Sequence, residues 1–138
     1  MGNSNQKIVD AFFEANGKHD IDKIKEVMDD SVVWYFMGRH PFAGIKRGVS
    51  EVVAFFDSMA KLMGESKPTV EKPIVSENDN YLIECVHTKT NRQDGINVDH
   101  HACVLWTFDQ GKIIEGRHFF SDPEALDRYL NAAAKAQK

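Results

Sequence analysis

The sequence predicts a single α+β domain spanning residues 1–138, with helices first and antiparallel strands after them. Three observations lead to this fold class. Apolar residues up to about residue 63 recur mainly at helical spacing, and those after residue 68 mostly alternate at strand spacing. No linker, internal repeat or low-complexity segment divides the chain. We therefore expect the helices to gather on one face of an antiparallel sheet.

Two helices are predicted before residue 29. The first begins at Asn3 or Ser4 and ends at Gly17, a residue that commonly terminates helices. Its apolar face consists of Ile8, Val9, Phe12 and Phe13. Asp20 is the expected N-cap of the second helix, because its short carboxylate accepts a backbone N–H of the first turn. The apolar face of that helix consists of Ile21, Ile24, Val27 and Met28.

A β-branched and aromatic run predicts a strand over residues 31–37, followed by a loop over residues 38–48 that contains three glycines and a proline. Ser50 is the expected N-cap of a third helix, which ends near Met63 because Gly64 follows. The expected buried side chains of this helix are Val52, Val53, Phe56, Met59 and Met63.

The remainder reads as four strands and a final helix. A strand over residues 69–76 contains Pro73, which predicts an edge strand or a bulge. A strand over residues 81–90 is joined to one over residues 98–108 by a two-residue turn at Asp94-Gly95. A three-residue turn at 109–111 leads to a strand through Ser121. The last helix starts at Asp122-Pro123, buries residues 126, 129 and 130, and frays over residues 132–138.

Composition excludes several classes of function. The formal net charge is −4 and the basic residues form no stripe, which argues against nucleic-acid binding. No apolar run is long enough to span a membrane, and the first residues lack the pattern of a signal peptide. We therefore expect a cytoplasmic location, with Cys85 and Cys103 as reduced, small core residues.

The strand after residue 111 carries the strongest concentration of chemical groups. Alternation places His118, Phe120 and Asp122 on the same face as Ile114 and Gly116. This line ends at a helix N-terminus, where anions are favoured. Two readings of the helix start remain open. Asp122 is itself a good N-cap before proline, and a capping box between Ser121 and Glu124 would instead leave its carboxylate available.

The predicted turns place further groups on that face. The three-residue turn puts Trp106 opposite Ile114 and Ala102 opposite His118, and the Asp94-Gly95 turn puts His87 opposite Ala102. The resulting face carries His87, Lys89, His100, Trp106, His118 and Asp122, among Cys85, Val104 and Phe120. A slip of one residue in the later hairpin, at residues 109–111, exchanges His100 for His101 and Asp99.

These residues suggest a pocket and no metal site. A sealed core would leave His118 and Asp122 desolvated, so a lined cavity suits them better. Trp34, Tyr35 and Trp106 are expected to hold a flat ligand by stacking or by a hydroxyl bond, with His100, His87 and Phe120 beside it. His100 and His101 point to opposite faces and cannot share one ion from a regular strand.

The element order, the Asp29–Trp34 stretch, the loop with Gly38, Pro41, Gly44 and Gly48, and Gly111-Lys112-Ile113 followed by Asp122 resemble SnoaL-like and ketosteroid-isomerase-related proteins. These belong to the nuclear-transport-factor-2-like superfamily. The resemblance implies a cystatin-like cone, in which a strongly curved sheet wraps around three N-terminal helices, plus a short C-terminal helix. It also implies a pocket, a homodimer through the sheet, and Asp122 as the general acid/base of a polyketide-cyclase-like enzyme.

The resemblance does not extend to steroid isomerisation, because the three positions used by true ketosteroid isomerases carry Phe12, Tyr35 or Phe36, and Val104. We therefore expect an enzyme without a cofactor that performs acid/base chemistry on an apolar carbonyl or polycyclic substrate, as an isomerase, cyclase or dehydratase. Asp122 moves the proton and His118 polarises the substrate or relays the proton. The alternative is a protein on the same scaffold that binds a small apolar molecule, or a second protein copy, without catalysis.

Overall fold

The structure is a computed structural model that describes residues 4–136, without the side chains of Ser4, Lys72 and Pro73. The predicted first cap at Asn3 lies outside the described residues. The elements in chain order are α1 (Ser4–Gly17), α2 (Ile21–Val27), β1 (Met28–Phe36), β2 (Gly44–Arg47), α3 (Gly48–Glu65), β3 (Thr69–Glu77), β4 (Tyr81–Lys89), β5 (Asp99–Asp109), β6 (Lys112–Phe120) and α4 (Pro123–Ala136).

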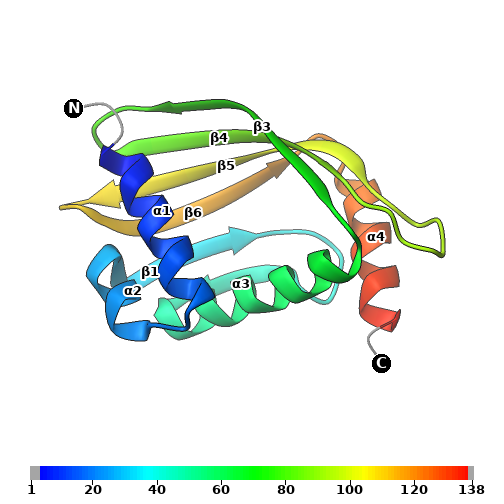
Figure 1. The fold of residues 1–138 in the computed structure, drawn as a ribbon, viewed down its shortest axis with the longest axis horizontal. Coiled ribbons are helices and arrows are strands. Elements are labelled where there is room, and N and C mark those ends of the chain that lie inside the picture. The colour runs from blue at the N-terminus through cyan, green and yellow to red at the C-terminus, as the bar shows by residue number, and fades with distance from the viewer. Residues whose placement is uncertain (1–3, 137–138) are drawn as a thin grey trace.

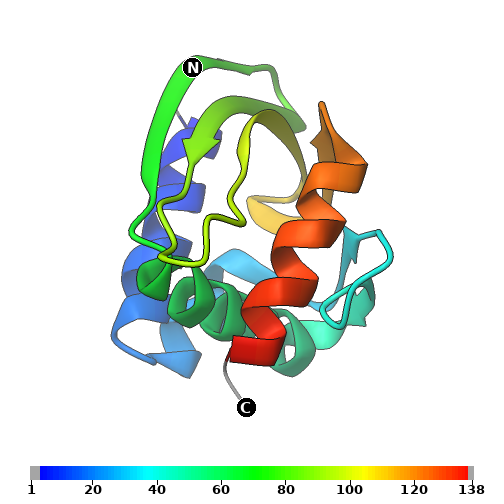
Figure 2. The same cartoon turned by 90° about the vertical axis from the view of Figure 1, so that its right-hand side faces the viewer.

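The strands form one curved six-stranded sheet within the described residues, in the order β2-β1-β6-β5-β4-β3. The first three helices lie along its concave side, and α4 crosses one end of the molecule (Figures 1 and 2). The predicted α+β cone is confirmed. The sheet is mixed rather than antiparallel throughout, because β1 pairs with β6 in parallel. The long connection between these two strands makes such a pairing possible.

The helix boundaries follow local chemistry. Asp20 caps α2 as predicted, accepting the Lys23 N–H at 3.3 Å. The predicted Ser50 cap is wrong, because α3 already begins at Gly48, and the Glu51 carboxylate accepts the backbone N–H of Arg47 at 2.9 Å. This bond satisfies a backbone donor at the helix start without a Ser side chain.

Both later helices run beyond their predicted ends. The third helix continues past Gly64 to Glu65, and the chain turns at Lys67, which adopts a left-handed φ of 50°. The prediction that residues 132–136 fray is also wrong. The last helix runs to Ala136, because Ala133 packs into the core and is only 2% exposed.

An aromatic cluster packs between α1 and the sheet. The rings of Trp34 and Trp106 lie 4.8 Å apart, and Phe12 packs against Trp106 at 6.2 Å. Gly116 of β6 pairs with Trp106 of β5 on one side and with Trp34 of β1 on the other. A Cβ atom at Gly116 would lie 2.0 Å from the Trp34 ring, so the glycine provides the space that this indole occupies.

The β5–β6 register differs from the predicted one because of two changes, each of which shifts the pairing by one residue. The turn contains two residues, since Gln110 and Gly111 both adopt positive φ and Asp109 pairs with Lys112. A bulge then inserts Ile114, so that Ile113 points inward and is fully buried. Together these changes shift the partners by two residues. His118 therefore faces Val104 rather than Ala102, yet stays on the predicted face.

The β4–β5 register is shifted by one residue, which has a larger consequence. Lys89 pairs with Asp99, and residues 90–98 form a wide loop instead of a two-residue turn. The Thr90 hydroxyl donates to Asn97 at 2.8 Å and accepts the Val98 N–H at 3.0 Å, which closes this loop. Because strand side chains alternate, the slip moves His87 to the outer face.

Strand β3 lies at the edge of the sheet, as the proline at residue 73 predicted. Its pairing with β4 shifts register between Glu71 and Ile74.

Candidate functional site

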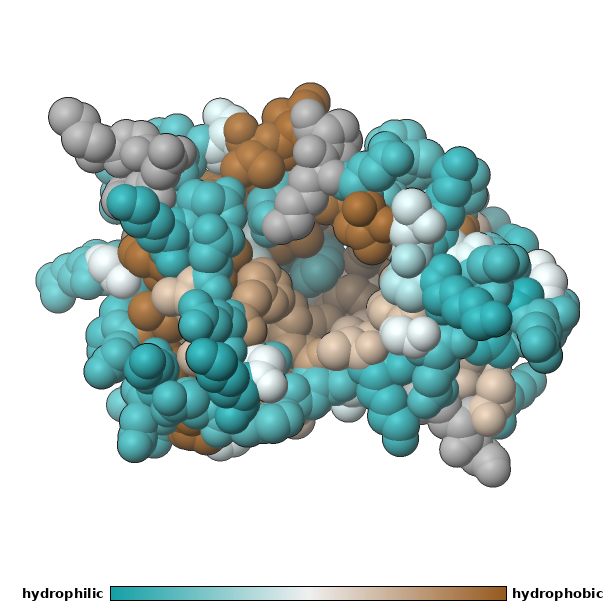
Figure 3. All heavy atoms as spheres, viewed as in Figure 1, coloured by the Kyte–Doolittle hydropathy of each residue, from teal (hydrophilic) through white to brown (hydrophobic). Residues whose placement is uncertain are grey.

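A cavity of about 190 Å³ lies between the concave face of the sheet and helices α3 and α4. Figure 3 shows a hollow with hydrophobic walls in the face between β3 and α3. The side chains from α3 and α4 that line the cavity are Phe55, Phe56, Met59, Met63, Leu126, Tyr129 and Leu130, and the polar groups on the sheet side are Thr88, His100 and His118. The site is thus apolar with few polar groups, as in small-molecule pockets.

His118 projects from the middle of β6 into this cavity. Its ring lies 5.0 Å from the Phe36 ring and 5.6 Å from that of Trp34, within a wall of aromatic side chains. Its Nε2 atom is buried and has no hydrogen-bond partner among the described residues. Burial lowers the pKa of His118 to about 4, because the charged imidazolium is poorly solvated there. The side chain is therefore a neutral imidazole at pH 7.

His100 forms the neighbouring polar point of the wall. It is 6% exposed and stacks on Phe120 with ring centroids 5.7 Å apart and an interplanar angle of 8°. Its Nδ1 atom also has no partner among the described residues. Burial lowers the pKa of His100, while the negative charge of Asp122 acts in the opposite direction. The prediction that His100, His118 and Phe120 share one face is confirmed.

Asp122 does not lie in the cavity. It is exposed, follows the end of β6 and caps α4, with its Oδ1 atom accepting the Ala125 N–H at 3.1 Å. The alternative capping box is not formed by Ser121, because its hydroxyl accepts the backbone N–H of His101 at 3.1 Å. The prediction that Asp122 faces the pocket is wrong, and its influence reaches the site through its charge near His100.

Tyr35 and His87 lie on the outer face of the sheet, contrary to prediction. The Tyr35 ring is covered by the Arg117 guanidinium at 3.9 Å. His87 bonds to Asp99 and stacks on His101 at 4.5 Å. Neither residue lines the cavity.

Trp34 and Trp106 face inward but belong to the core behind the cavity. They are 0% and 1% exposed, and neither is among the cavity-lining residues. The Trp106 indole N–H donates to Glu84, and the Trp34 Nε1 atom is buried without a partner among the described residues. The prediction that these rings hold a ligand by direct contact is not supported by their positions.

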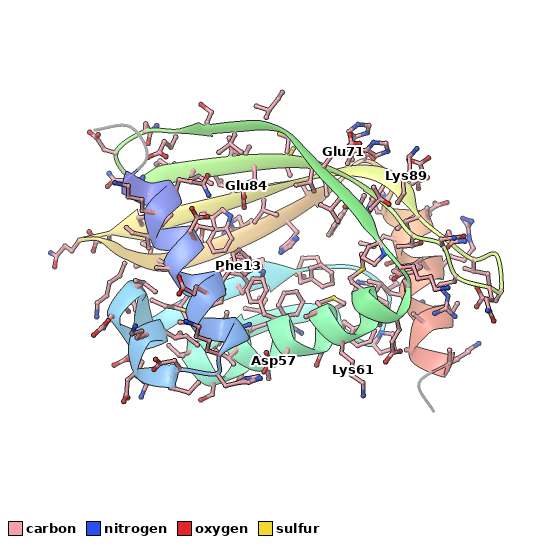
Figure 4. All side chains as sticks on the ribbon, in the orientation of Figure 1. Phe13, Asp57, Lys61, Glu71, Glu84 and Lys89 are labelled. Atoms are coloured by element: carbon pink, nitrogen blue, oxygen red, sulfur yellow. The ribbon has the colours of Figure 1, made fainter. Side chains whose placement is uncertain are left out.

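Glu84 is a buried acid that the sequence reasoning missed. It is 4% exposed and accepts the Trp106 Nε1–H at 2.8 Å. Figure 4 shows it on the side of the sheet that α1 covers. Glu84, Val104 and His118 form one cross-strand row, which separates the carboxylate and the imidazole by two strand spacings, roughly 10 Å. Its position between Leu82 and Val86 in an alternating strand was the available signal.

Two structural findings concern metals and membranes. Among residues 4–136, no three His, Cys, Asp or Glu side chains are grouped so as to hold a metal ion. Within the same range, no helix combines the length and hydropathy needed to cross a membrane.

Comparison with known families decides the identity of the domain. A model of the SnoaL-like domain matches residues 9–116, most of the chain. The chain belongs to the SnoaL-like domain family. A protein of Mycobacterium tuberculosis without a described function is 27% identical to this SnoaL-like domain over 118 residues, which are 85% of this chain and 88% of the relative.

Solved structures agree with the SnoaL-like fold. A nuclear-transport-factor-2-like protein from Burkholderia xenovorans superposes with a TM-score of 0.74 at 20% identity, covering 94% of this chain and 97% of its own. A protein with a cystatin-like fold from Xanthomonas campestris gives a TM-score of 0.66 at 20% identity, with coverage of 91% and 96%. At this level of identity the similarity concerns the fold alone.

Proposed function

We propose that this SnoaL-like domain binds a small apolar carbonyl compound in its cavity and catalyses proton transfer on it without a cofactor. The observation that carries the proposal is the pair of imidazoles, His118 and His100, on a mostly apolar wall. Each has a buried ring nitrogen without a partner among the described residues. An unsatisfied buried polar atom costs about 1–3 kcal/mol, which a ligand oxygen near these nitrogens would recover.

The cavity volume narrows the substrate class. A cavity of about 190 Å³ is slightly larger than one of roughly 150 Å³ that accommodates benzene. It therefore suits a molecule of one or two rings. The ring faces of Phe36, Phe55 and Phe120 suit a flat ligand.

The two imidazoles support different roles in the reaction. His118, with a pKa of about 4, stays neutral and can donate a hydrogen bond to the substrate carbonyl oxygen. His100 then takes a proton from the carbon next to the carbonyl. The Asp122 charge stabilises the imidazolium that forms on His100. Return of the proton to another carbon completes an isomerisation, and loss of a β-hydroxide completes a dehydration.

A direct test uses 2-tetralone, a two-ring ketone, whose α-hydrogens exchange with D₂O once they are abstracted. Replacing His100 with Phe is expected to slow enzyme-dependent exchange, followed by proton NMR, about 100-fold. His101→Phe is the matched control, since His101 is exposed on the outer face and its neighbour His100 is not. Equal exchange rates for the wild type and His100→Phe, with both proteins folded by circular dichroism, would contradict the role of His100 as the base.

A non-catalytic binding protein is the second candidate, favoured by the low pKa values of both imidazoles and by the position of Asp122 outside the cavity. In that case 2-tetralone binds, as measured by calorimetry, while exchange by the wild type is no faster than by His100→Phe. Absence of both binding and exchange contradicts both candidates for this probe class.

We also propose that a second copy of the chain covers the outer face of the sheet, as the family resemblance implies. Large apolar side chains are exposed there, including Ile74 at 59% and Phe119 at 53%. Both flank the Cys85–Cys103 pair in one cross-strand row. A contiguous apolar surface of this kind is typical of an interface.

Phe119→Asp is expected to weaken the dimer at least about 100-fold, because the new carboxylate would be desolvated in the interface. Sedimentation equilibrium over a range of concentrations measures the effect. Met37→Asp is the control, since Met37 is 57% exposed just beyond the end of β1. A wild type that remains monomeric at high concentration contradicts the proposed dimer.

A further inference from the structure

The two cysteines of the chain face each other on neighbouring strands. Cys85 of β4 pairs directly with Cys103 of β5, and their Sγ atoms lie 2.9 Å apart. Both are free thiols in the structure. Directly opposite residues of antiparallel strands have Cα atoms about 4.5–5.5 Å apart, within the range of about 4.4–6.8 Å that disulfides adopt. The paired positions are therefore within the reach of a disulfide.

The thiol pair is separate from the cavity. Cys85 lies between Glu84 and Val86, whose side chains point to the concave side, so Cys85 itself points outward. In a single chain Cys85 and Cys103 are partly exposed, so a small reagent reaches them before a second copy covers the outer face. Their neighbours along the row are the exposed Ile74 and Phe119.

We propose that Cys85 and Cys103 form a redox site that closes to an intramolecular disulfide by exchange with a small disulfide such as oxidised glutathione. In the first step the Cys85 thiolate attacks one sulfur of glutathione disulfide, which yields a mixed disulfide and one glutathione thiolate. In the second step the Cys103 sulfur attacks Cys85, loses its proton and releases the second glutathione. Two protein thiols are oxidised and one glutathione disulfide is reduced to two thiols.

The order of the steps follows from the environment of Cys103. Its hydrogen bond with Cys85, together with burial, raises the pKa of the Cys103 thiol to about 11. Since the thiolate is the nucleophile, Cys103 is held in its unreactive form until Cys85 has reacted. Cys85 therefore opens the exchange and Cys103 resolves it, aided by the short distance between the two sulfur atoms.

The test equilibrates the full chain with defined ratios of reduced and oxidised glutathione, followed by acid quenching and intact-mass measurement. The wild type is expected to lose two hydrogens in one transition, with both thiols disappearing together and without a stable glutathione adduct. Cys103→Ser should instead accumulate one glutathione on Cys85, because the resolving sulfur is missing. Cys85→Ser should likewise stop at one glutathione, on Cys103, because the second sulfur is missing.

Three outcomes would overturn the proposal. The wild type keeps both thiols at ratios that glutathionylate Cys103→Ser, or it accumulates a stable adduct, or non-reducing gels show a disulfide between two chains. None of these outcomes bears on 2-tetralone exchange, so this inference and the proposed function fail separately.

Discussion

Gly116→Ala is expected to destabilise the protein by at least about 3 kcal/mol. The added Cβ would lie 2.0 to 2.3 Å from three atoms of the Trp34 ring. Trp34 is fully buried and its ring packs against Trp106 and Phe56, so it has no space into which to retreat. Overpacking of this kind forces side chains off their rotamers and displaces the backbone.

Urea denaturation measures this effect, and the melting temperature should fall by roughly 10 °C for a domain of this size. Gly64→Ala is the control, since no atom lies within 4 Å of the added Cβ and the residue lies inside α3. Alanine should stabilise the helix there by about 0.5–1 kcal/mol. An unchanged unfolding midpoint for Gly116→Ala would contradict the packing described for Trp34.

The stability of the protein is expected to fall by about 3 kcal/mol between pH 6.5 and pH 4 because of His118. Its pKa is about 4 in the folded state and 6.5 in the unfolded chain. Within this window the unfolded state binds more protons, so the free energy of unfolding rises with pH. The contribution is therefore complete above pH 6.5 and is lost as the pH falls towards 4.

Two other histidines add to the expected loss of stability at low pH. Burial also lowers the pKa values of His100 and His40, which adds loss of stability in the same direction. The exposed carboxylates with lowered pKa values, including Asp94 and Asp99, titrate below this window, from a reference of 3.8 downwards. The histidines therefore dominate the acid response between pH 6.5 and pH 4.

Denaturation curves of His118→Phe and wild type at several pH values isolate the contribution of this histidine. The variant should lose about 3 kcal/mol less stability than the wild type between pH 6.5 and pH 4. His19→Gln, which replaces an exposed histidine on the surface, should retain the wild-type profile. Parallel pH profiles for wild type and His118→Phe would show that His118 is not desolvated as described.

Several features of the fold depend on local chemistry and were predictable from the sequence. Apolar spacing located the helices and strands, Asp20 indicated the start of α2, and alternation placed His118 and Phe120 on one face. The predicted face of His118 was correct although its predicted partner on β5 was wrong, because the shorter turn and the bulge at Ile114 changed the register by two residues. A shift of two preserves which side a strand side chain faces.

The site required information that sequence spacing does not carry. The side chains of Thr90 and Asn97 bond across the wide loop after β4 and close it, and the accompanying slip of one residue places His87 on the outer face. It also places Glu84 inside and brings the two cysteines together on the outer face. These outcomes depend on how loop side chains pair in space.

The sequence by itself determined the element order, the α+β class and the face that carries His118, since all of these follow from periodicity along the chain. The tertiary structure alone decided which groups meet. It made Asp122 a helix cap, placed Trp34 and Trp106 in the core, and left His100 and His118 as the two imidazoles of a mostly apolar cavity. Register and burial depend on contacts between distant segments, and periodicity contains no record of those contacts.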